Sequence, residues 1–292
     1  MKRLAALMLI LVLLLSSALA EPLPVWEPPV EGKLMNDYDT ETLKYRIIGF
    51  EHKGVVCYLT SIWMADPGRQ IKKATAVWEE SLSLPSDMAK QVPGAALAVN
   101  GSGYVSPQFP WIPENYPGVS KDYHYTPLGS LTITNGEVFR HLEGVGYYGL
   151  TLQADGLHLH VDEAPEAVLA QNPSQTWSFY IECPLIRDGA DILDRSWDFA
   201  NRKAQRTIIA KKDANNYVLL TVSNKRSTGM KLVDSVDFLL EYIQPEWAYN
   251  LDGGPSSALL ARSNGDKKLK TIYGNNSKDT DIMAFAELPA EP

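Results

Sequence analysis

Short apolar runs bounded by turn residues recur along the chain from Thr42 onward, and this pattern limits the fold more than any other feature of the sequence. Runs of about four to eight residues that end at such turns predict β-strands. We expect turns at Asn135-Gly136 and at 154–156. We expect strands at 46–49, 55–59, 95–99, 131–134, 149–153, 157–161, 176–181, 207–210, 217–223 and 247–251, and a hairpin that joins 258–262 to 269–273 around Asn264-Gly265.

Helical periodicity is confined to two segments, 86–92 and 232–243. In the second segment Val236, Leu239 and Ile243 fall on one face, and Pro245 ends the helix. No internal repeat and no second linker divides residues 42–292. We therefore expect an α+β fold, a single domain with a mixed, mainly antiparallel β-sheet core and a few helices.

The composition agrees with a globular domain of this kind. Hydrophobic residues make up 45% of the 292 residues and charged residues 21%, which excludes a coiled coil, a collagen-like chain and a disordered chain. The formal net charge is −8, and a chain without a basic surplus is not expected to bind nucleic acid. Residues 21–41 are rich in proline and acidic residues and predict an extended arm outside the core.

The N-terminal sequence has the features of an export signal. The basic pair Lys2-Arg3 precedes an apolar run from Leu4 to Leu15 and the small-residue pattern Ala18-Leu19-Ala20. These features predict a signal peptide over residues 1–20, cleavage after Ala20 and a secreted or extracytoplasmic protein. The alternative is a retained anchor, but the apolar run is shorter than the roughly 20 residues that cross a bilayer. We expect no transmembrane segment in the mature chain.

Cys57 and Cys183 are the only cysteines in the sequence. An oxidising compartment would permit a disulfide between them. Both lie in apolar, strand-like runs, where two separate buried thiols are at least as well supported. The sequence leaves this pairing open.

Two predicted strands end in the same way, at a polar residue followed by glycine. The two stretches are Ala98-Val99-Asn100-Gly101-Ser102-Gly103-Tyr104 and Tyr249-Asn250-Leu251-Asp252-Gly253-Gly254-Pro255-Ser256-Ser257. A strand end holds its side chain rigidly, and glycine lets backbone N–H groups approach a phosphate or a sugar. Taken alone, each loop is more often a tight turn.

Arg206 stands at the start of another predicted strand. Its planar guanidinium matches the oxygens of a phosphate in pairs, so an arginine fixed beside a glycine-rich loop would bind an anion. Taken alone, an arginine at a strand start is more often a solvated surface residue.

These segments, taken together and in order, resemble the phosphodiester glycosidase family, which includes N-acetylglucosamine-1-phosphodiester α-N-acetylglucosaminidase and bacterial exopolysaccharide-related proteins. The resemblance extends from about Tyr58 to Phe285, and its last piece is the most specific. The pieces are Ile62-Trp63-Met64-Ala65-Asp66-Pro67, Ala98-Val99-Asn100-Gly101, Ile133-Thr134-Asn135-Gly136-Glu137, Pro184-Leu185-Ile186-Arg187-Asp188-Gly189, Arg206-Thr207-Ile208-Ile209, Ser227-Thr228-Gly229-Met230 and Asn250-Leu251-Asp252-Gly253-Gly254-Pro255-Ser256-Ser257.

The resemblance implies hydrolysis of the bond between an anomeric carbon and a phosphate oxygen, in a glycan or glycosyl phosphate at the cell envelope. It implies Asp252 as the leading catalytic carboxylate, because an oxocarbenium-like transition state needs negative charge beside it. Asp281 is the candidate for a second carboxylate, although a solvated turn residue fits that position equally well. The implied substrate-binding residues are Asn100, Gly101, Arg206, Thr207, Asn250, Gly253, Gly254, Ser256 and Ser257.

The chain also departs from the family pattern. Ser102 and Gly103 stand where an aromatic pair is common, and Ala210 and Pro255 stand where glycine is common. The basic residue expected just before Asp281 has no clear counterpart, and Lys278 is the nearest. These departures keep open a non-catalytic glycan-binding module on the same scaffold.

Other kinds of chemistry have weaker support. A divalent cation, Ca²⁺ or Mg²⁺, would suit the oxygens of Asp252 and a phosphate, and it would also permit cleavage at the phosphorus–oxygen bond, but no cofactor is certain from the sequence. The spacing of His158 and His160 predicts exposed strand histidines better than a metal site. The residues around Ser256 lack the final glycine of a nucleophile elbow, which disfavours an esterase. Segment 104–127 contains the aromatic residues Phe109, Trp111, Tyr116, Tyr123 and Tyr125. Their rings could pack against the apolar face of a sugar, or they could pack against one another in a surface loop.

Overall fold

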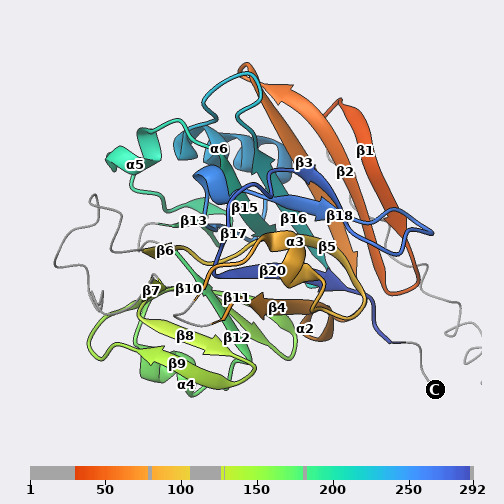
Figure 1. Cartoon of the computed structure of the whole chain (residues 1–292). Coiled ribbons are helices and arrows are strands. Elements are labelled where there is room, and N and C mark those ends of the chain that lie inside the picture. Colours follow the sequence, from red (N-terminus) through yellow and green to blue (C-terminus); the bar gives the residue numbers. More distant parts are fainter. Residues whose placement is uncertain (1–29, 78–80, 106–125, 128, 180–182, 290–292) are drawn as a thin grey trace, which may run out of the picture.

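The residues that the structure describes form three β-sheets and one two-stranded ribbon (Figure 1). The computed structural model describes residues 30–77, 81–105, 126–127, 129–179 and 183–289. The signal sequence and most of the aromatic segment 104–127 lie outside these residues, so the predictions made for them are not addressed by the structure. Within the described residues no helix is long and apolar enough to cross a membrane.

The first sheet carries both the N-terminal strands and the strands that lead to the site. Its central strand β16 is buried on both faces, because Tyr217 and Leu219 point to one side and Val218 and Leu220 to the other. The order of its eight strands is β1 (Lys33–Asp39), β2 (Leu43–His52), β3 (Val55–Met64), β16 (Asn216–Val222), β15 (Arg206–Lys211), β17 (Trp247–Asn250), β13 (Pro184–Arg187) and β14 (Ala190–Asp191).

The second and third sheets have five strands each, and strands β6 (Tyr104–Val105) and β7 (Thr126–Pro127) form the ribbon. The second sheet runs β19 (Lys270–Tyr273), β18 (Leu259–Ala261), β5 (Ala95–Asn100), β20 (Asp281–Ala286), β4 (Ile71–Thr75). The third sheet runs β11 (Gly156–Glu163), β10 (Tyr147–Gln153), β12 (Gln175–Ser178), β8 (Leu131–Thr134), β9 (Glu137–His141).

Every pairing recorded among the described strands is antiparallel, so the expectation of a mixed sheet was wrong. The fold is broadly α+β but predominantly β. The predicted turn at Asn135-Gly136 is a two-residue hairpin in which both residues have positive φ, 52° and 80°. It joins β8 to β9, a mostly exposed strand that has too little apolar alternation for the sequence to reveal.

The helices in the described part of the chain are short. They are α2 (Pro67–Gln70), α3 (Pro85–Ala89), α4 (Pro165–Leu169), α5 (Asp198–Asn201) and α6 (Leu232–Phe238), followed by a π-helical turn at Leu239–Ile243. The last two correspond to the predicted helix 232–243. Gln244 has φ 51° and donates its N–H to the carbonyl of Leu239, and Pro245 has no N–H with which to continue the helix.

The largest apolar core lies where the three sheets face one another. Tyr45 of β2, Val99 of β5 and Trp177 of β12 all belong to this cluster and are fully buried. A second cluster lies on the other face of the first sheet, where α6 packs through Leu232 and Val236. The sheets therefore converge on one interior, and the strand ends that border it carry the residues described below.

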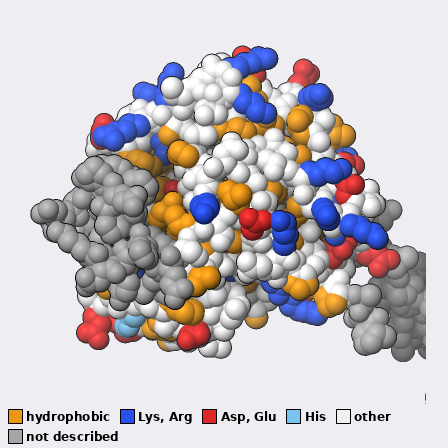
Figure 2. Space-filling view, in the orientation of Figure 1, with side chains coloured by type: hydrophobic (Ala, Val, Ile, Leu, Met, Phe, Trp, Pro, Cys, Tyr) orange, Lys and Arg blue, Asp and Glu red, His pale blue; other side chains and the backbone are white. Residues whose placement is uncertain are grey.

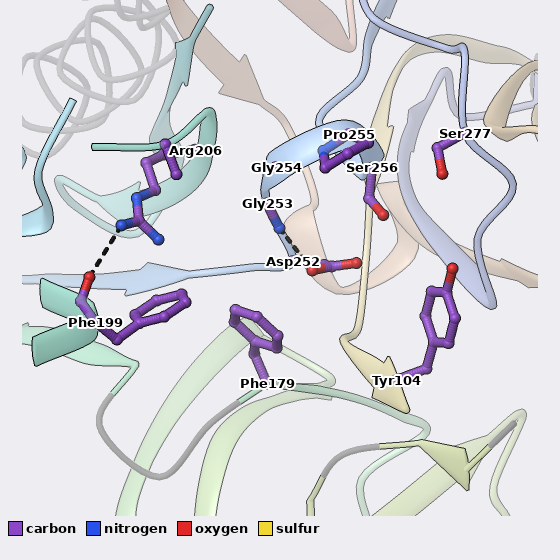
Figure 3. A pocket seen from close by; sticks show the side chains of 11 residues that line it. Tyr104, Phe179, Phe199, Arg206, Asp252, Gly253, Gly254, Pro255, Ser256 and Ser277 are labelled. Atoms are coloured by element: carbon purple, nitrogen blue, oxygen red, sulfur yellow. Dashed lines mark hydrogen bonds between the residues drawn. The ribbon is translucent and has the colours of Figure 1, made fainter. Parts of the chain in front are cut away.

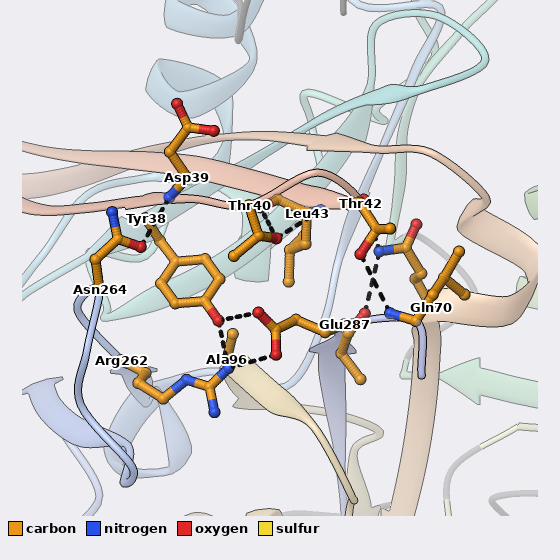
Figure 4. A network of polar contacts seen from close by, with 12 residues as sticks. Tyr38, Asp39, Thr40, Thr42, Leu43, Gln70, Ala96, Arg262, Asn264 and Glu287 are labelled. Carbon is orange, nitrogen blue, oxygen red and sulfur yellow. Dashed lines mark hydrogen bonds and ion pairs between the residues drawn. The ribbon is translucent and has the colours of Figure 1, made fainter. Parts of the chain in front are cut away.

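Residues 21–41 do not form an arm along their whole length. Residues 33–39 form β1, which pairs with β2, and Tyr38 is buried against Tyr45. The hydroxyl of Tyr38 donates to the carboxylate of Glu287, and Arg262 donates to both of them (Figure 4). The prediction was wrong here because β1 has a single buried apolar side chain, and its other anchors come from the far end of the chain.

The two cysteines are separate buried thiols, with no disulfide between them. Burial raises the pKa of the Cys57 thiol to about 12, so this group stays protonated and packs as a small apolar side chain. On the face shown in Figure 2, basic and acidic side chains are interspersed with apolar ones, so charge is not segregated by sign there.

Candidate active site

The three stretches singled out in the sequence meet at one place, and Asn100 joins them. Asn100 ends β5 and is fully buried. Its side-chain Nδ2 donates to the backbone carbonyl of Asp252 at 2.6 Å. Its Oδ1 accepts from the Thr207 hydroxyl at 2.7 Å and from the Ala258 amide at 3.1 Å. The Asn100 amide is thus used within the protein, and it fixes the loop after β17 against the start of β15.

A cavity of about 300 Å³ opens beside this junction (Figure 3). Arg206 and Phe199 lie at one end, and Tyr104 and Ser277 lie at the other, with Asp252 between them. The remaining lining residues are Phe179, Ala204, Gly253, Gly254, Pro255 and Ser256. The cavity therefore combines one cation, one carboxyl group and several aromatic rings.

Arg206 is a buried cation without an acidic partner among the described residues. Only 1% of the residue is exposed, and its Nη2 donates to two backbone carbonyls, those of Phe199 at 3.2 Å and Arg202 at 2.8 Å. The guanidinium carbon lies 4.5 Å from the centre of the Phe199 ring, and Nε has no hydrogen-bond partner within the described part of the chain. Burial lowers the pKa of Arg206 to about 10, so the group remains charged at neutral pH. Such a cation favours an anion in the cavity, because an unpaired buried charge is costly.

Asp252 is the carboxyl group that faces the cavity. Its Oδ1 accepts the N–H of Gly253 at 2.7 Å, and its own N–H donates to the carbonyl of Gly101 at 3.0 Å. Burial raises the pKa of Asp252 to about 7, and the negative charge of Asp281 adds to the rise, against hydrogen bonds from Gly253 and Ser256. Asp252 can therefore both hold and release a proton near neutral pH.

The glycine amides that were expected to hold a phosphate are already occupied. Gly253 donates to Asp252, and Gly254 donates to the carbonyl of Gln205 at 3.0 Å. Gly253 is needed for space, because a Cβ there would lie 2.8 Å from the same Gln205 oxygen. These amides orient the carboxyl group and close the loop in the structure described here. Ser256, in the same loop, lines the cavity and has a polar hydroxyl group.

The other predicted site residues lie behind the cavity. Thr207, Asn250 and Ser257 are fully buried and do not line it. The Asn250 Nδ2 donates to the carbonyl of Leu251 at 2.8 Å. The cavity lining thus includes five of the eleven predicted residues, namely Arg206, Asp252, Gly253, Gly254 and Ser256.

Asp281 is neither solvated nor in the cavity lining, so the turn alternative was wrong. It begins β20 and is 2% exposed. Its Oδ1 accepts the N–H of Ser102 at 2.7 Å, and its Oδ2 lies 3.0 Å from the Nζ of Lys73. The expected basic partner therefore comes from β4 and not from Lys278. No motif marks this pairing, because Lys73 is one of two adjacent lysines in a short strand.

Asp279 is a third buried carboxyl group that the sequence did not single out. It is fully buried, its Oδ1 accepts the N–H of Thr280 at 2.8 Å, and its Oδ2 has no partner among the described residues. Burial raises its pKa well above the usual range, and the charges of Asp252 and Asp281 add to this rise. Burial therefore favours the protonated form of Asp279.

The glycine at position 101 leaves room for Asp281. A Cβ on Gly101 would lie 1.8 Å from Oδ1 of Asp281, whose carboxylate is held on both sides. We expect Gly101→Ala to lower the free energy of unfolding by about 3 kcal/mol, measured by denaturant unfolding. Gly54→Ala is the comparator: its Cβ would meet nothing within 4 Å, although its φ is 75°, and it should cost only about 1 kcal/mol. Equal losses in the two variants would contradict the proposed clash.

Two aromatic rings of the cavity lining come from outside the segment 104–127. The ring of Phe179, beyond the end of β12, lies against Gly103, where a Cβ would come within 1.9 Å of the ring. Phe199 packs between Arg206 and Trp197, whose ring centre is 4.6 Å away. Both rings come from segments that carry no sugar-binding pattern in the sequence, and only their position in the fold brings them to the site.

Among the residues with a described position, neither a metal site nor a histidine-activated serine lies near the cavity. In the described part of the chain no group of three His, Cys, Asp or Glu side chains could hold a metal ion. His160 is 2% exposed and contacts Thr151 and Glu163, so the expectation of two exposed histidines was wrong for this residue. No histidine is among the described residues that line the cavity beside Ser256.

Comparisons with known proteins agree with this fold. The family model for phosphodiester glycosidase matches residues 93–285. The structure is similar to the zebrafish N-acetylglucosamine-1-phosphodiester α-N-acetylglucosaminidase catalytic domain, auto-inhibited by its pro-peptide, with a TM-score of 0.62, 16% identity and 89% of each chain covered. It is also similar to a hypothetical protein from Synechocystis, with a TM-score of 0.56, 13% identity, and 88% of this chain and 64% of that chain covered. No curated protein sequence matches the chain.

Proposed function

Because the chain belongs to the phosphodiester glycosidase family, we propose that it hydrolyses the bond between an anomeric carbon and a phosphate oxygen in a phosphodiester-linked sugar. The observation that carries this proposal is the buried Arg206 guanidinium, which has no carboxylate partner among the described residues and shares a cavity with Asp252. An anionic substrate would supply the missing negative charge.

The phosphate is assigned to Arg206. In the reaction the bond from the anomeric carbon to the phosphate oxygen breaks, and the phosphate leaves with the electron pair. A phosphate monoester is already a good leaving group, so it needs charge stabilisation more than a proton donor. A guanidinium held in place by two carbonyls and the face of Phe199 provides that charge without reorganisation.

Asp252 is assigned to the anomeric carbon. In its ionised form it stabilises the positive charge that develops there and accepts the proton of the water that forms the new carbon–oxygen bond. Its raised pKa makes it a stronger base than an ordinary aspartate. Asp281 is assigned a positioning role and not a catalytic one, because both of its oxygens are bound within the protein.

The sugar is assigned to the part of the cavity near Tyr104, Ser256 and Ser277, on the side of Asp252 away from Arg206 (Figure 3). Hydroxyl groups and an aromatic ring suit the polar edge and the apolar face of a sugar. We further propose that the reaction takes place outside the cytoplasm on a cell-envelope or extracellular glycan, on the strength of the signal-like sequence of residues 1–20.

The proposal is tested by incubating the protein with a panel of α-glycosyl phosphodiesters in ¹⁸O-labelled water. We expect free sugar together with a phosphate monoester that carries no ¹⁸O. Label in the phosphate would mean cleavage at the phosphorus–oxygen bond and would overturn the assignment. Binding of glycosyl phosphates without release from any substrate would instead favour a non-catalytic glycan-binding module.

A further inference from the structure

The side chain of Lys73 is fully buried near the site, and its ammonium group contacts a carboxylate, a backbone carbonyl and an aromatic ring. Its Nζ lies 3.0 Å from Oδ2 of Asp281 and donates to the carbonyl of Thr176 at 2.7 Å. The same Nζ lies 5.6 Å from the centre of the Trp177 ring. Lys73 belongs to the second sheet, whereas Thr176 and Trp177 belong to the third. This one ammonium group therefore connects two sheets beneath the cavity.

The contacts continue from Lys73 to the catalytic carboxyl group in three steps. Lys73 holds Asp281, and Asp281 accepts the N–H of Ser102. The carboxylate also fills the space above the α-carbon of Gly101, whose own N–H donates to the backbone carbonyl of Asp281 at 3.1 Å. Gly101 in turn accepts the N–H of Asp252 through its carbonyl. A displacement of Asp281 would thus reach the backbone of Asp252 through Gly101.

We propose that Lys73 is a positioning residue for the reaction: paired with Asp281, it holds the 100–102 turn in place and supplies the fixed positive charge against which the carboxyl groups of the site titrate. This inference rests on the proposed function and deepens it. Lys73 does not line the cavity, so its action passes through Asp281 and not through the substrate.

The charges around Asp252 make the electrostatic part of this proposal specific. The groups that face it are the carboxyl groups of Asp279 and Asp281, the Tyr104 phenol, which is neutral, and the Arg206 guanidinium across the cavity. Within the Lys73–Asp281 pair, the negative charge of Asp281 raises the pKa of Asp252. We expect the Lys73 ammonium group, 3.0 Å from the Asp281 carboxylate, to oppose that effect.

The test compares the wild type with Asp281→Asn and with the double variant Lys73→Met/Asp281→Asn. Asparagine removes the negative charge and leaves the cation, so the pKa of Asp252 should fall by about one unit. The double variant also removes the cation, so its pKa should lie between those of Asp281→Asn and the wild type. This order of pKa values should appear in the acidic limb of the profile of kcat/KM against pH. It should also appear in a ¹³C NMR titration of the Asp252 carboxyl, whose signal is identified because it is missing from the spectrum of Asp252→Asn.

Equal pKa values in Asp281→Asn and the double variant would overturn the inference and leave Lys73 a purely structural residue. If Asp281→Asn alone does not fold because Lys73 is then unpaired, Lys73→Met is compared with the wild type instead: loss of the cation alone should raise the pKa of Asp252, and an unchanged pKa would overturn the inference. Lys211→Met is the matched control: it removes a lysine that pairs with Glu246 at 3.3 Å, outside the cavity lining, and should leave the titration unchanged. A wild type that releases no sugar would reject the proposed function, and the NMR titration would still test Lys73.

Discussion

Asp252→Asn should lower kcat for sugar release by about 10³-fold or more, because asparagine can neither accept the proton of water nor stabilise a cation at the anomeric carbon. The side chain keeps its size, and the Gly253 amide still has an oxygen to which it can donate. The measurement is a steady-state assay on the phosphodiester that the wild type cleaves fastest. Activity within about tenfold of the wild type would remove Asp252 from its assigned role.

The same variant supplies its own folding control. The pKa of Asp252 in the folded protein is about 7, above its value in an unfolded chain, so folded wild type binds the proton more tightly. The wild type therefore loses stability as the pH rises from about 4 to about 7, whereas asparagine does not titrate. Above pH 7, Asp252→Asn should have the higher free energy of unfolding, by about 2 kcal/mol, and the gain should shrink toward pH 4. An inactive and destabilised variant would point to misfolding.

Arg206→Gln is the second substitution with a large expected effect. It should lower kcat/KM by about 10³-fold, because the developing charge on the leaving phosphate loses its only buried cation among the residues that line the cavity. Arg206→Lys should recover part of this loss, since an ammonium keeps the charge but not the planar pair of donors. Both values come from initial rates over a range of substrate concentrations.

A binding measurement separates this effect from a general loss of structure. Glycosyl phosphates should inhibit the wild type competitively and raise its melting temperature, and both effects should be lost in Arg206→Gln. The matched control is Arg195→Gln, which removes a surface arginine paired with Asp191 and Asp237 and should change neither. Arg206→Gln with normal inhibition by glycosyl phosphates would show that the phosphate binds elsewhere.

The sequence was a good guide wherever the signal was local. Asn135-Gly136 specified a hairpin because few other residue pairs accept positive φ twice in succession. Residues 217–223 specified a strand because both faces of β16 are buried, so the run is mostly apolar and only Thr221 and Ser223 are polar. The strand β1 was missed because its stability comes from contacts of Tyr38 with Arg262 and Glu287, more than 220 residues away.

For the site, the sequence identified residues that belong to a recognisable motif. It missed residues that reach the site only because distant strands pair. Asn100, Arg206 and Asp252 were recognised, and they do converge. The role of Asn100 could not be predicted, because a side chain at a strand end can face a ligand or another loop with the same local sequence. Lys73 carries no motif, and only the pairing of β4 with β20 brings it to Asp281.

The junction at Asn100 also bears on how the protein folds. Its three side-chain hydrogen bonds span 107, 152 and 158 residues of chain. None of them can form until distant strands of the first and second sheets have come together. Contacts of such high sequence separation slow folding, because their loop-closure entropy is lost before they become favourable. Catalytic competence should consequently appear among the last events of maturation, and a newly made chain would remain inactive towards phosphodiesters until its final strands were in place.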